Sequence, residues 1–277
     1  MNYDICIVGA GFSGLYLANL TSDYQYSIVI MDKKKEIGKP THCTGLISKK
    51  TAEVLGYVAK RTIEARYSGI KFFDLDQGKE LILIKLRDEV LKIDRVLLEQ
   101  LLSQKIMDKG LELRLRTKVT KITADGKVIL NTLNTIECGL VVIAEGASQV
   151  LTSSIGLGYT SDRILGIQGY VRKGSKVEND YFYVLISNEL DPDFFGWIVP
   201  MDKYVLIGLG GKNITINELR GLVKRASHYG LTYLEEPRDV FGGYILRGPP
   251  LRKLSTGKVI VVGDASGFTK PITGGGL

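Results

Sequence analysis

A glycine-rich loop near the N-terminus is the feature that most constrains how this chain can fold. The apolar run at residues 3–8 predicts a strand buried on both faces, and residues 15–20 predict a helix. Between them, Gly9, Gly11 and Gly14 have the spacing of a dinucleotide-binding turn. In such a turn the first glycine permits a tight bend, the second admits a pyrophosphate, and the third lets helix and strand pack closely. The helix N-terminus adds free N–H groups and the positive end of a dipole.

A second apolar strand completes this unit. Residues 27–31 predict a buried strand, and Asp32 stands at its end, where a carboxylate can bind the hydroxyls of a ribose. The loop, its context and the acid agree, so we expect a Rossmann-like α/β domain that binds a dinucleotide. The alternative is a structural strand–helix turn without a ligand. The glycine pattern itself does not choose between NAD and FAD.

The composition is that of a globular protein and excludes several classes. Of the 277 residues, 44% are hydrophobic and 24% are charged, which argues against a mainly disordered chain. No apolar run is long enough to span a bilayer, and the N-terminus lacks the pattern of a secretion signal. The net charge is +7, but residues 33–35 form the only basic run, so we expect no nucleic-acid partner. An anionic cofactor, a lipid headgroup or a membrane surface fits this charge as well.

The cysteines and histidines predict neither a metal site nor a disulfide framework. Cys6, Cys43 and Cys138 match no zinc spacing, and His42 and His228 are the only histidines. We expect Cys6 and Cys138 to be core or surface residues without chemistry. We also expect a reducing compartment, the cytoplasm.

The rest of the chain predicts a mainly antiparallel sheet inserted into the α/β domain. Short strand patterns follow one another after residue 63 and again after residue 164, and a buried strand returns near residue 259. We therefore expect a discontinuous cofactor-binding domain and a substrate domain. The first consists of residues 1–62, 92–160 and 240–277, and the second consists of residues 63–91 and 161–239.

Two segments resemble motifs of one flavoprotein group. Residues 263–276 follow a strand, begin with a glycine and Asp264 and end in three glycines, similar to the second FAD motif of glutathione-reductase-like flavoproteins. Residues 144–148 resemble the middle motif of the branch that is shaped like para-hydroxybenzoate hydroxylase. In that motif Glu145 stands where Asp is usual.

A third segment completes the resemblance to this branch. Arg95, with Glu99 four residues on, resembles the Arg-to-acid segment near the cofactor phosphates. Together with the glycine-rich loop, the order of these motifs implies FAD as the cofactor. The residues that the resemblance places against it are Gly9, Ala10, Gly11, Phe12, Ser13, Gly14, Asp32, Lys33, His42, Cys43, Thr44, Gly45, Arg95, Val119, Ala144, Glu145, Gly146, Gly263, Asp264, Pro271, Gly274, Gly275 and Gly276.

The loop at residues 38–46 and the segment that begins at Phe195 resemble the geranylgeranyl reductases, which include archaeal enzymes that saturate the isoprenoid chains of membrane lipids. That family has a Cys-x-x-Gly-Leu-like turn over the flavin. It also has a Tyr-x-Trp-x-Phe-Pro pattern that is followed by Gly-x-Gly. Here Gly208 and Gly210 complete the second pattern, while Phe195 replaces the Tyr and Val199 replaces the Phe. Phe195 lacks the hydroxyl of the family's Tyr, but the apolar character of this position is retained.

This resemblance implies that C=C double bonds of geranylgeranyl chains are reduced in membrane lipid biosynthesis. Hydride passes from N5 of reduced FAD to one alkene carbon, with coupled protonation of the other. Cys43, or a water that it positions, is the candidate proton donor, and Phe195, Trp197 and Pro200 are the candidate substrate-binding residues. The implied partners are a polyprenyl lipid, NAD(P)H or ferredoxin as electron donor, and the inner face of the membrane through peripheral contact.

These assignments have plainer alternatives. Cys43 can be a small packing residue, His42 a structural loop residue, and Trp197 with Phe195 ordinary sheet core. The runner-up function is a flavin-dependent monooxygenase or halogenase of the same fold, although a halogenase needs a catalytic lysine that the sequence does not place. Family members continue past the triple glycine into a helix whose N-terminus faces the flavin, and that helical region is absent from this sequence, which ends at Leu277. A truncated FAD-binding protein without activity is therefore a third expectation.

Overall fold

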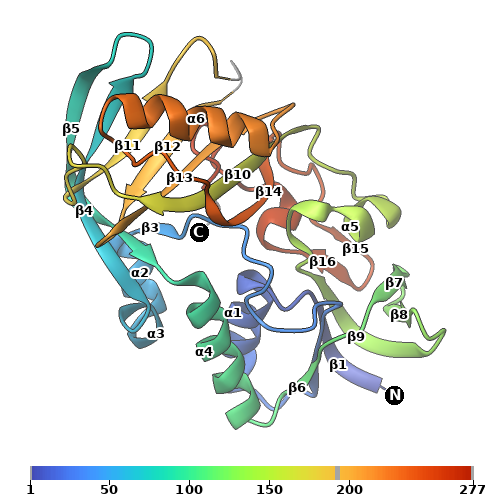
Figure 1. Cartoon of the computed structure of the whole chain (residues 1–277). Coiled ribbons are helices and arrows are strands. Elements are labelled where there is room, and N and C mark those ends of the chain that lie inside the picture. The colour runs from blue at the N-terminus through green and yellow to red at the C-terminus, as the bar shows by residue number, and fades with distance from the viewer. Residues whose placement is uncertain (1, 191–193, 276–277) are drawn as a thin grey trace. The chain divides into compact units, whose positions relative to one another are not determined.

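The computed structural model describes residues 2–190 and 194–275, and the strands within them form two eight-stranded sheets (Figure 1). Each sheet belongs to its own unit with its own hydrophobic core. The described residues of the first unit are 2–39, 96–163 and 246–275. Those of the second unit are 40–95, 164–190 and 194–245.

The first unit is built on a parallel sheet. β1 pairs in parallel with β2 on one side and with β9 on the other, and β6 and β16 extend the sheet outward. β15 and the hairpin of β7 and β8 join it in antiparallel pairing. Its elements are β1 (Asn2–Val8), α1 (Phe12–Thr21), β2 (Ile28–Met31), α4 (Arg95–Asp108), β6 (Glu112–Arg114), β7 (Val119–Ile122), β8 (Lys127–Leu130), β9 (Thr135–Ile143), α5 (Val150–Ser154), β15 (Ser255–Thr256), β16 (Val259–Val261) and the 3₁₀ turns η1 (Gly146–Ser148) and η2 (Gly263–Ser266).

The predicted β-α-β unit is confirmed by β1, α1 and β2. All four residues of β2 and the last three of β1 are buried, as expected for parallel strands covered on both faces. The expected helix after residue 94 is α4, and Gly110 follows it with φ +79°, a conformation that glycine adopts without strain. The α/β fold class is therefore as predicted.

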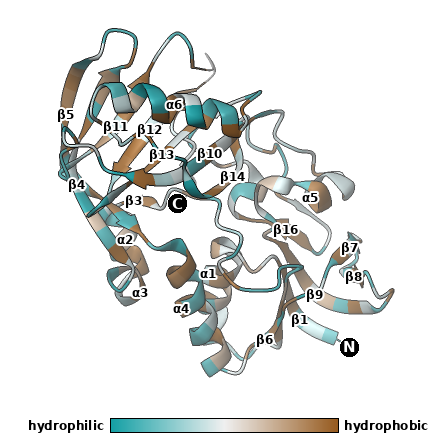
Figure 2. Ribbon diagram, in the orientation of Figure 1, coloured by the Kyte–Doolittle hydropathy of each residue, from teal (hydrophilic) through white to brown (hydrophobic). Residues whose placement is uncertain are grey.

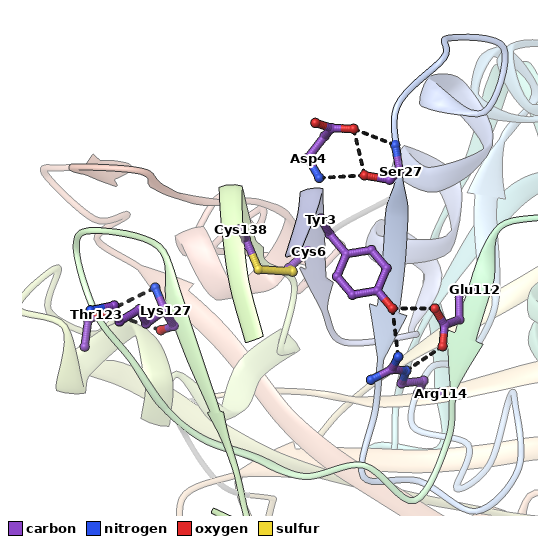
Figure 3. The surroundings of a disulfide bond; sticks show 9 residues. All are labelled: Tyr3, Asp4, Cys6, Ser27, Glu112, Arg114, Thr123, Lys127 and Cys138. Atoms are coloured by element: carbon purple, nitrogen blue, oxygen red, sulfur yellow. Dashed lines mark hydrogen bonds and ion pairs between the residues drawn. A yellow bond between two sulfur atoms is a disulfide. The ribbon is translucent and has the colours of Figure 1, made fainter. Parts of the chain in front are cut away.

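A disulfide joins Cys6 of β1 to Cys138 of β9 (Figure 3). The two strands pair in parallel, and the Cα atoms of the two cysteines lie 6.0 Å apart, within the range of a disulfide. Both cysteines are buried in the core of the first unit. The expectation that they carry no chemistry is wrong. Their proximity depends on a strand pairing between segments 132 residues apart, which no local pattern reveals.

A polar cluster beside the disulfide ties β1 to β6 across the intervening strand (Figure 3). The hydroxyl of Tyr3 donates to Oε2 of Glu112 at 2.6 Å, and Nη2 of Arg114 donates to the same hydroxyl at 2.7 Å. The hydrogen bond to Glu112 raises the pKa of Tyr3, and the hydrogen bond from Arg114 lowers the pKa of Glu112. The cluster therefore fixes β6 at the edge of the sheet.

The second unit is a mainly antiparallel sheet in the order β14-β10-β13-β12-β11-β4-β5-β3, in which β11 and β4 pair in parallel. This agrees with the predicted inserted sheet. Its elements are β3 (Leu46–Ser48), α2 (Lys49–Leu55), α3 (Tyr57–Lys60), β4 (Ile63–Asp74), β5 (Lys79–Ile93), β10 (Asp162–Arg172), β11 (Tyr181–Ile186), β12 (Gly196–Pro200), β13 (Tyr204–Gly211), α6 (Ile216–His228) and β14 (Arg238–Gly248).

The helix α6 covers one face of this sheet. Its apolar side, formed by Leu219, Leu222, Val223 and Ala226, is buried against the strands. A capping box starts the helix, in which the side chain of Thr215 accepts a backbone N–H and the carboxylate of the third helical residue accepts the N–H of Thr215. Hydrophobic residues run along β12 and β13 beneath it (Figure 2).

Residues 40–62 belong to the second unit, whereas the sequence assigned them to the cofactor domain. The reason is that β3 pairs with β5, so it extends the second sheet, and α2 packs against the same strand. A three-residue strand is too short to show a periodicity, and the segment around it was therefore predicted as a loop. The long strand β14 was not predicted either.

Two kinds of feature are absent from residues 2–190 and 194–275. No helix there is long and apolar enough to cross a membrane. No group of three or more His, Cys, Asp and Glu side chains there is placed to hold a metal ion. The third cysteine, Cys43, is an exposed free thiol.

The disulfide predicts how many thiols can be alkylated. Denatured without reductant, the chain should take up one alkyl group, at Cys43, and after reduction it should take up three. The double variant Cys6→Ala/Cys138→Ala should lower the free energy of unfolding. A disulfide that closes so long a loop restricts the unfolded chain by about 4–5 kcal/mol in the chain-entropy model. Mass spectrometry and denaturant unfolding measure the two effects.

Cys43→Ala is the matched control, because it removes the free thiol and leaves the disulfide intact. It should abolish alkylation without reductant and change stability little. Uptake of three alkyl groups by the unreduced wild-type chain would show that Cys6 and Cys138 are not paired.

Candidate functional site

The glycine-rich loop of the first unit is a close backbone contact that side chains cannot enter. Gly9 has φ +118°, and a Cβ on it would lie 2.2 Å from the carbonyl oxygen of Ala144 at the end of β9. A Cβ on Gly14 would lie 1.9 Å from the carbonyl oxygen of Gly9. These two glycines therefore let the start of α1 pack on the ends of β1 and β9, as the spacing predicted.

Gly11 differs, because the space in front of it is open. A Cβ on Gly11 would meet no atom within 4 Å, and the residue is the N-cap of α1 with extended backbone. No side-chain hydrogen bond caps α1 at Gly11. An uncapped helix N-terminus behind a glycine without steric neighbours fits the pyrophosphate of a dinucleotide.

The neighbours of Gly11 support the loop. Ala10 is fully buried, and the ring of Phe12 stacks on that of Tyr16 with centroids 5.5 Å apart. Ser13 packs against Gly263 of η2, where a Cβ would lie 2.2 Å from the serine Oγ. The first and last predicted motifs of the cofactor site therefore meet at this point.

A charged triad lies at the end of β2. Oδ2 of Asp32 accepts the backbone N–H of Ala10 at 2.7 Å, and Oδ1 accepts that of Lys34 at 2.9 Å. The ammonium of Lys34 lies 3.7 Å from Asp32 and 3.8 Å from Glu99 of α4, and it donates to the carbonyl of Ala10 at 2.9 Å. Sequence analysis named Lys33, which is exposed, and missed Lys34. The basic run gave no sign of which lysine turns inward.

Glu145, in the middle motif, forms hydrogen bonds with the start of α5. Its carboxylate accepts the N–H groups of Val150, Leu151 and Thr152, and the hydroxyl of Thr152 donates to it at 2.8 Å. It therefore holds the first turn of α5, and its longer side chain reaches N–H groups that an aspartate at this position could not reach in the same way. Gly146 beside it has φ +69° and open space in front.

The remaining predicted residues of the first unit form a mixed set. Val119 is buried in the core on β7, and Asp264 lies half-exposed in η2. Pro271 is exposed, and the following loop is tight, because the N–H of Gly274 donates to the carbonyl of Lys270 at 2.8 Å. Gly275 closes the same loop through its carbonyl oxygen, at 2.9 Å from the Lys270 nitrogen, and Gly276 lies outside the described residues.

The loop around Cys43 lies in the second unit. The thiol is exposed, and its Sγ accepts the N–H of Gly45 at 3.3 Å. His42 donates through Nδ1 to the carbonyl of Gly242 at 2.8 Å, and Thr44 donates through Oγ1 to the side chain of Gln168 at 3.0 Å. Each residue that flanks Cys43 is therefore fastened to a strand of the second sheet.

Gly45 closes the loop against β5. Its φ is +80°, and a Cβ on it would lie 2.5 Å from the carbonyl oxygen of Ile93 and 3.6 Å from Cγ of Arg95. The buried ammonium of Lys92 lies beneath, where it donates to Glu64 at 2.6 Å and to the carbonyl of Ile93 at 3.0 Å. The predicted residue Arg95 thus packs along this loop, and Lys92 and Glu64 were not predicted.

An aromatic face lies on the side of the second sheet opposite α6, formed by Tyr67, Tyr170, Phe182, Phe194, Phe195, Trp197 and Phe241 around Val199 and Leu206. As expected, Phe195 and Trp197 lie on the same side, with their rings 6.4 Å apart edge to face. The Gly-x-Gly pattern has a steric reason. A Cβ on Gly208 would lie 2.5 Å from Cζ2 of Trp197, and one on Gly210 would lie 2.5 Å from Cδ1 of Phe194.

Two polar groups of this face, on Tyr67 and Trp197, are paired inside the protein. The hydroxyl of Tyr67 donates to the carbonyl of Pro200 at 2.6 Å, and the indole N–H of Trp197 donates to Gln168 at 3.1 Å. Burial, reinforced by Glu64, raises the pKa of Tyr67 well above its usual range, so the phenol is neutral. The face therefore presents mainly carbon.

Comparison with known proteins agrees with the fold described above. A digeranylgeranylglycerophospholipid reductase of Methanosarcina mazei is 23% identical, over 99% of this chain and 71% of its own length. A geranylgeranyl bacteriochlorophyll reductase-like protein of Thermoplasma acidophilum has a structure that matches with a TM-score of 0.83 at 21% identity, over 99% of this chain and 74% of its own. The flavin-dependent brominase Bmp2 matches with a TM-score of 0.71 at 14% identity, over 99% of this chain and 74% of its own.

These matches confirm the predicted resemblance to geranylgeranyl reductases and the flavoprotein fold. The model of the family described as lycopene cyclase protein matches residues 4–277. Because that match spans nearly the whole sequence, the chain belongs to the lycopene cyclase protein family.

Proposed function

We propose that this chain is a flavin-dependent oxidoreductase that reduces C=C double bonds in the isoprenoid chains of membrane lipids. The observation that carries the proposal is the aromatic face of the second unit. The donors of Tyr67, Trp197 and Thr44 are already paired within the protein, so an apolar chain on this face leaves none of them unpaired. A polar aromatic substrate would find few free partners there.

The first unit has the features needed to hold the cofactor. Gly11 and the N-terminus of α1 fit the pyrophosphate, and Asp32 at the end of β2 is placed for a ribose. Lys34 orients the Asp32 carboxylate through an ion pair and a backbone hydrogen bond. When bound, a reduced flavin supplies the hydride that such a reduction needs. NAD(P)H or ferredoxin are the proposed electron donors that reduce it.

The residues of the second unit supply orientation and the proton. An isolated isoprenoid double bond is not electrophilic, so its protonation must lead or accompany the arrival of hydride. We assign proton donation to the thiol of Cys43 or to a water that it holds. The N–H of Gly45 donates to Sγ at 3.3 Å and holds the sulfur in place within the loop. The aromatic face excludes water around the alkene.

A surface of β5 fits peripheral contact with the membrane in which such a substrate lies. β3 covers the edge of β5 only at residues 90–92, and the strand before them has an unpaired edge. Of the acidic side chains on this stretch, Glu80 pairs with Lys71 and Glu89 pairs with Arg66, while Asp88 is exposed. The patch, here called the β5 edge patch, consists of Leu81, Ile82 and Ile84, which are 46%, 54% and 41% exposed, and the cations Lys79, Lys85 and Arg87.

Gly11→Val should abolish flavin retention, because the side chain fills the open space at the N-terminus of α1. The extended backbone of Gly11 accepts valine, so folding should persist. Flavin affinity should fall roughly tenfold or more, as measured by absorbance of the purified protein and by titration of flavin fluorescence. Gly221→Val in α6 is the control, since that glycine also faces open space and should leave flavin binding unchanged. Equal binding by wild type and Gly11→Val would contradict the assigned cofactor loop.

Cys43→Ala should slow reduction of a polyprenyl lipid by about a hundredfold, the usual contribution of a positioned proton donor, with flavin content unchanged. The assay is anaerobic, with dithionite-reduced protein and mass spectrometry of the lipid, in which each saturated double bond adds the mass of two hydrogens. A wild-type rate in Cys43→Ala would remove the thiol from the mechanism. Oxygen-dependent consumption of reduced flavin coupled to an aromatic substrate, without lipid reduction, would favour the monooxygenase alternative.

Replacing the three aliphatic residues of the β5 edge patch by serine should weaken binding to vesicles that contain anionic phospholipid. Lys and Arg near such a surface contribute about 1 kcal/mol each, so binding should also fall as salt is raised. Sedimentation with phosphatidylglycerol vesicles measures it. The control is the triple variant Leu133→Ser/Val150→Ser/Leu234→Ser, which removes three exposed apolar side chains outside the patch. Equal losses of vesicle binding in both variants would overturn the assignment.

A further inference from the structure

Gln168 connects the Cys43 loop to the aromatic face. It lies on β10, is only 3% exposed, and belongs to no motif that the sequence singled out. Its side-chain oxygen accepts two hydrogen bonds, from the indole N–H of Trp197 at 3.1 Å and from the hydroxyl of Thr44 at 3.0 Å. One buried acceptor therefore joins the residue next to Cys43 to the largest ring of the aromatic face.

Strand register explains how these side chains meet. Gln168 on β10 lies opposite Gly208 on β13, and Trp197 on β12 lies opposite the same glycine. The three residues form a row across three neighbouring strands and share one face of the sheet. A Cβ on Gly208 would lie 2.6 Å from Cβ of Gln168 and 2.5 Å from the indole, so only glycine lets the ring cross β13 and reach the amide.

The amide is well suited to this position. A carbonyl oxygen has two lone pairs, and here each meets one donor, so the acceptor is fully used. Removing it would leave two donors without a partner in a buried environment, which costs more than the loss of a single exposed hydrogen bond. Leucine has the same approximate size and no acceptor, while glutamate keeps both acceptor positions.

We propose that Gln168 is a positioning residue that holds the Cys43 loop and the Trp197 indole in one fixed arrangement. His42 and Gly45 fasten the two ends of the loop, through Gly242 and through the N–H of Ile93. The bond from Thr44 to Gln168 fastens its middle, next to the thiol. The role of this arrangement in turnover rests on the proposed function, in which the thiol and the apolar wall act on the same alkene.

Two measurements, on Trp197 and on Cys43, detect changes in this arrangement without an activity assay. Trp197 is the only tryptophan, so emission excited at a wavelength that tyrosine does not absorb reports its surroundings alone. Cys43 is the only cysteine outside the disulfide, so the alkylation rate of the native, unreduced protein reports the loop. Both readings come from the full chain under conditions in which it is folded.

Gln168→Leu should shift the tryptophan emission and raise the alkylation rate of the exposed Cys43 about fivefold, because a loop that has lost one buried hydrogen bond no longer holds Sγ against the N–H of Gly45. Thr44→Val should raise the alkylation rate similarly and leave the emission unchanged, because the bond from Trp197 remains. Gln168→Glu should restore both readings toward wild type, since the carboxylate accepts both donors. In lipid reduction, Gln168→Leu should lower kcat with little change in KM.

Gln149→Leu is the matched control in the first unit. Gln149 is 2% exposed and makes three buried hydrogen bonds that span a loop. Its Oε1 accepts the N–H of Thr160 at 2.8 Å, and its Nε2 donates to the hydroxyl of Thr160 at 3.2 Å and to the carbonyl of Ala265 at 3.0 Å. This variant should lose stability without changing the emission of Trp197 or the alkylation of Cys43. The same changes in both glutamine variants would indicate general loosening and overturn the proposal.

Unchanged alkylation and emission in Gln168→Leu would also overturn it. If that variant fails to fold, Thr44→Val decides, because it removes only one hydroxyl of a half-buried residue, and an unchanged alkylation rate would reject the link. Loss of lipid reduction in the wild-type chain would refute the proposed function alone, since both measurements would still test the arrangement.

Discussion

The first unit depends on a contact between two stretches of backbone. Gly9 lies so close to the carbonyl of Ala144 that any side chain would displace β9 from β1, and Gly14 lies as close to Gly9 itself. Because these contacts exist, α1 starts directly above the sheet, and Gly11, its N-cap, faces open space. The cofactor site is therefore a consequence of steric exclusion, and its charged residues are arranged around a position that packing has already fixed.

The same constraint recurs in the second unit with a different result. Gly208 and Gly210 lack side chains so that Trp197 and Phe194 from the neighbouring strand can lie across β13. In the first unit the missing side chains admit backbone and leave room for a phosphate. In the second they admit aromatic rings, which close the gap and create an apolar face. Glycines at short, regular spacing thus mark both surfaces on which the proposed chemistry depends.

This difference explains what could be predicted. The absence of a side chain can be read directly from the sequence, so the glycine loop, Asp32 and the Phe195-to-Gly210 segment could be found. The disulfide and the contacts of Gln168 arise where separate strands come into register, and β3 is too short to leave a pattern. Lys34 and Lys33 are chemically alike, so only the path of the backbone decides which one reaches Asp32.

The polar groups of the second unit indicate why its aromatic face suits an alkene. A buried indole N–H and a buried phenol would each be costly if left without an acceptor. Gln168 and the carbonyl of Pro200 provide those acceptors, and the buried ammonium of Lys92 is paired with Glu64 beneath the Cys43 loop. With these needs met internally, the indole and the phenol of Tyr67 lose no hydrogen bond to an apolar ligand. In the proposed reaction the exposed thiol of Cys43 is the proton donor, because the substrate has no polar atom of its own.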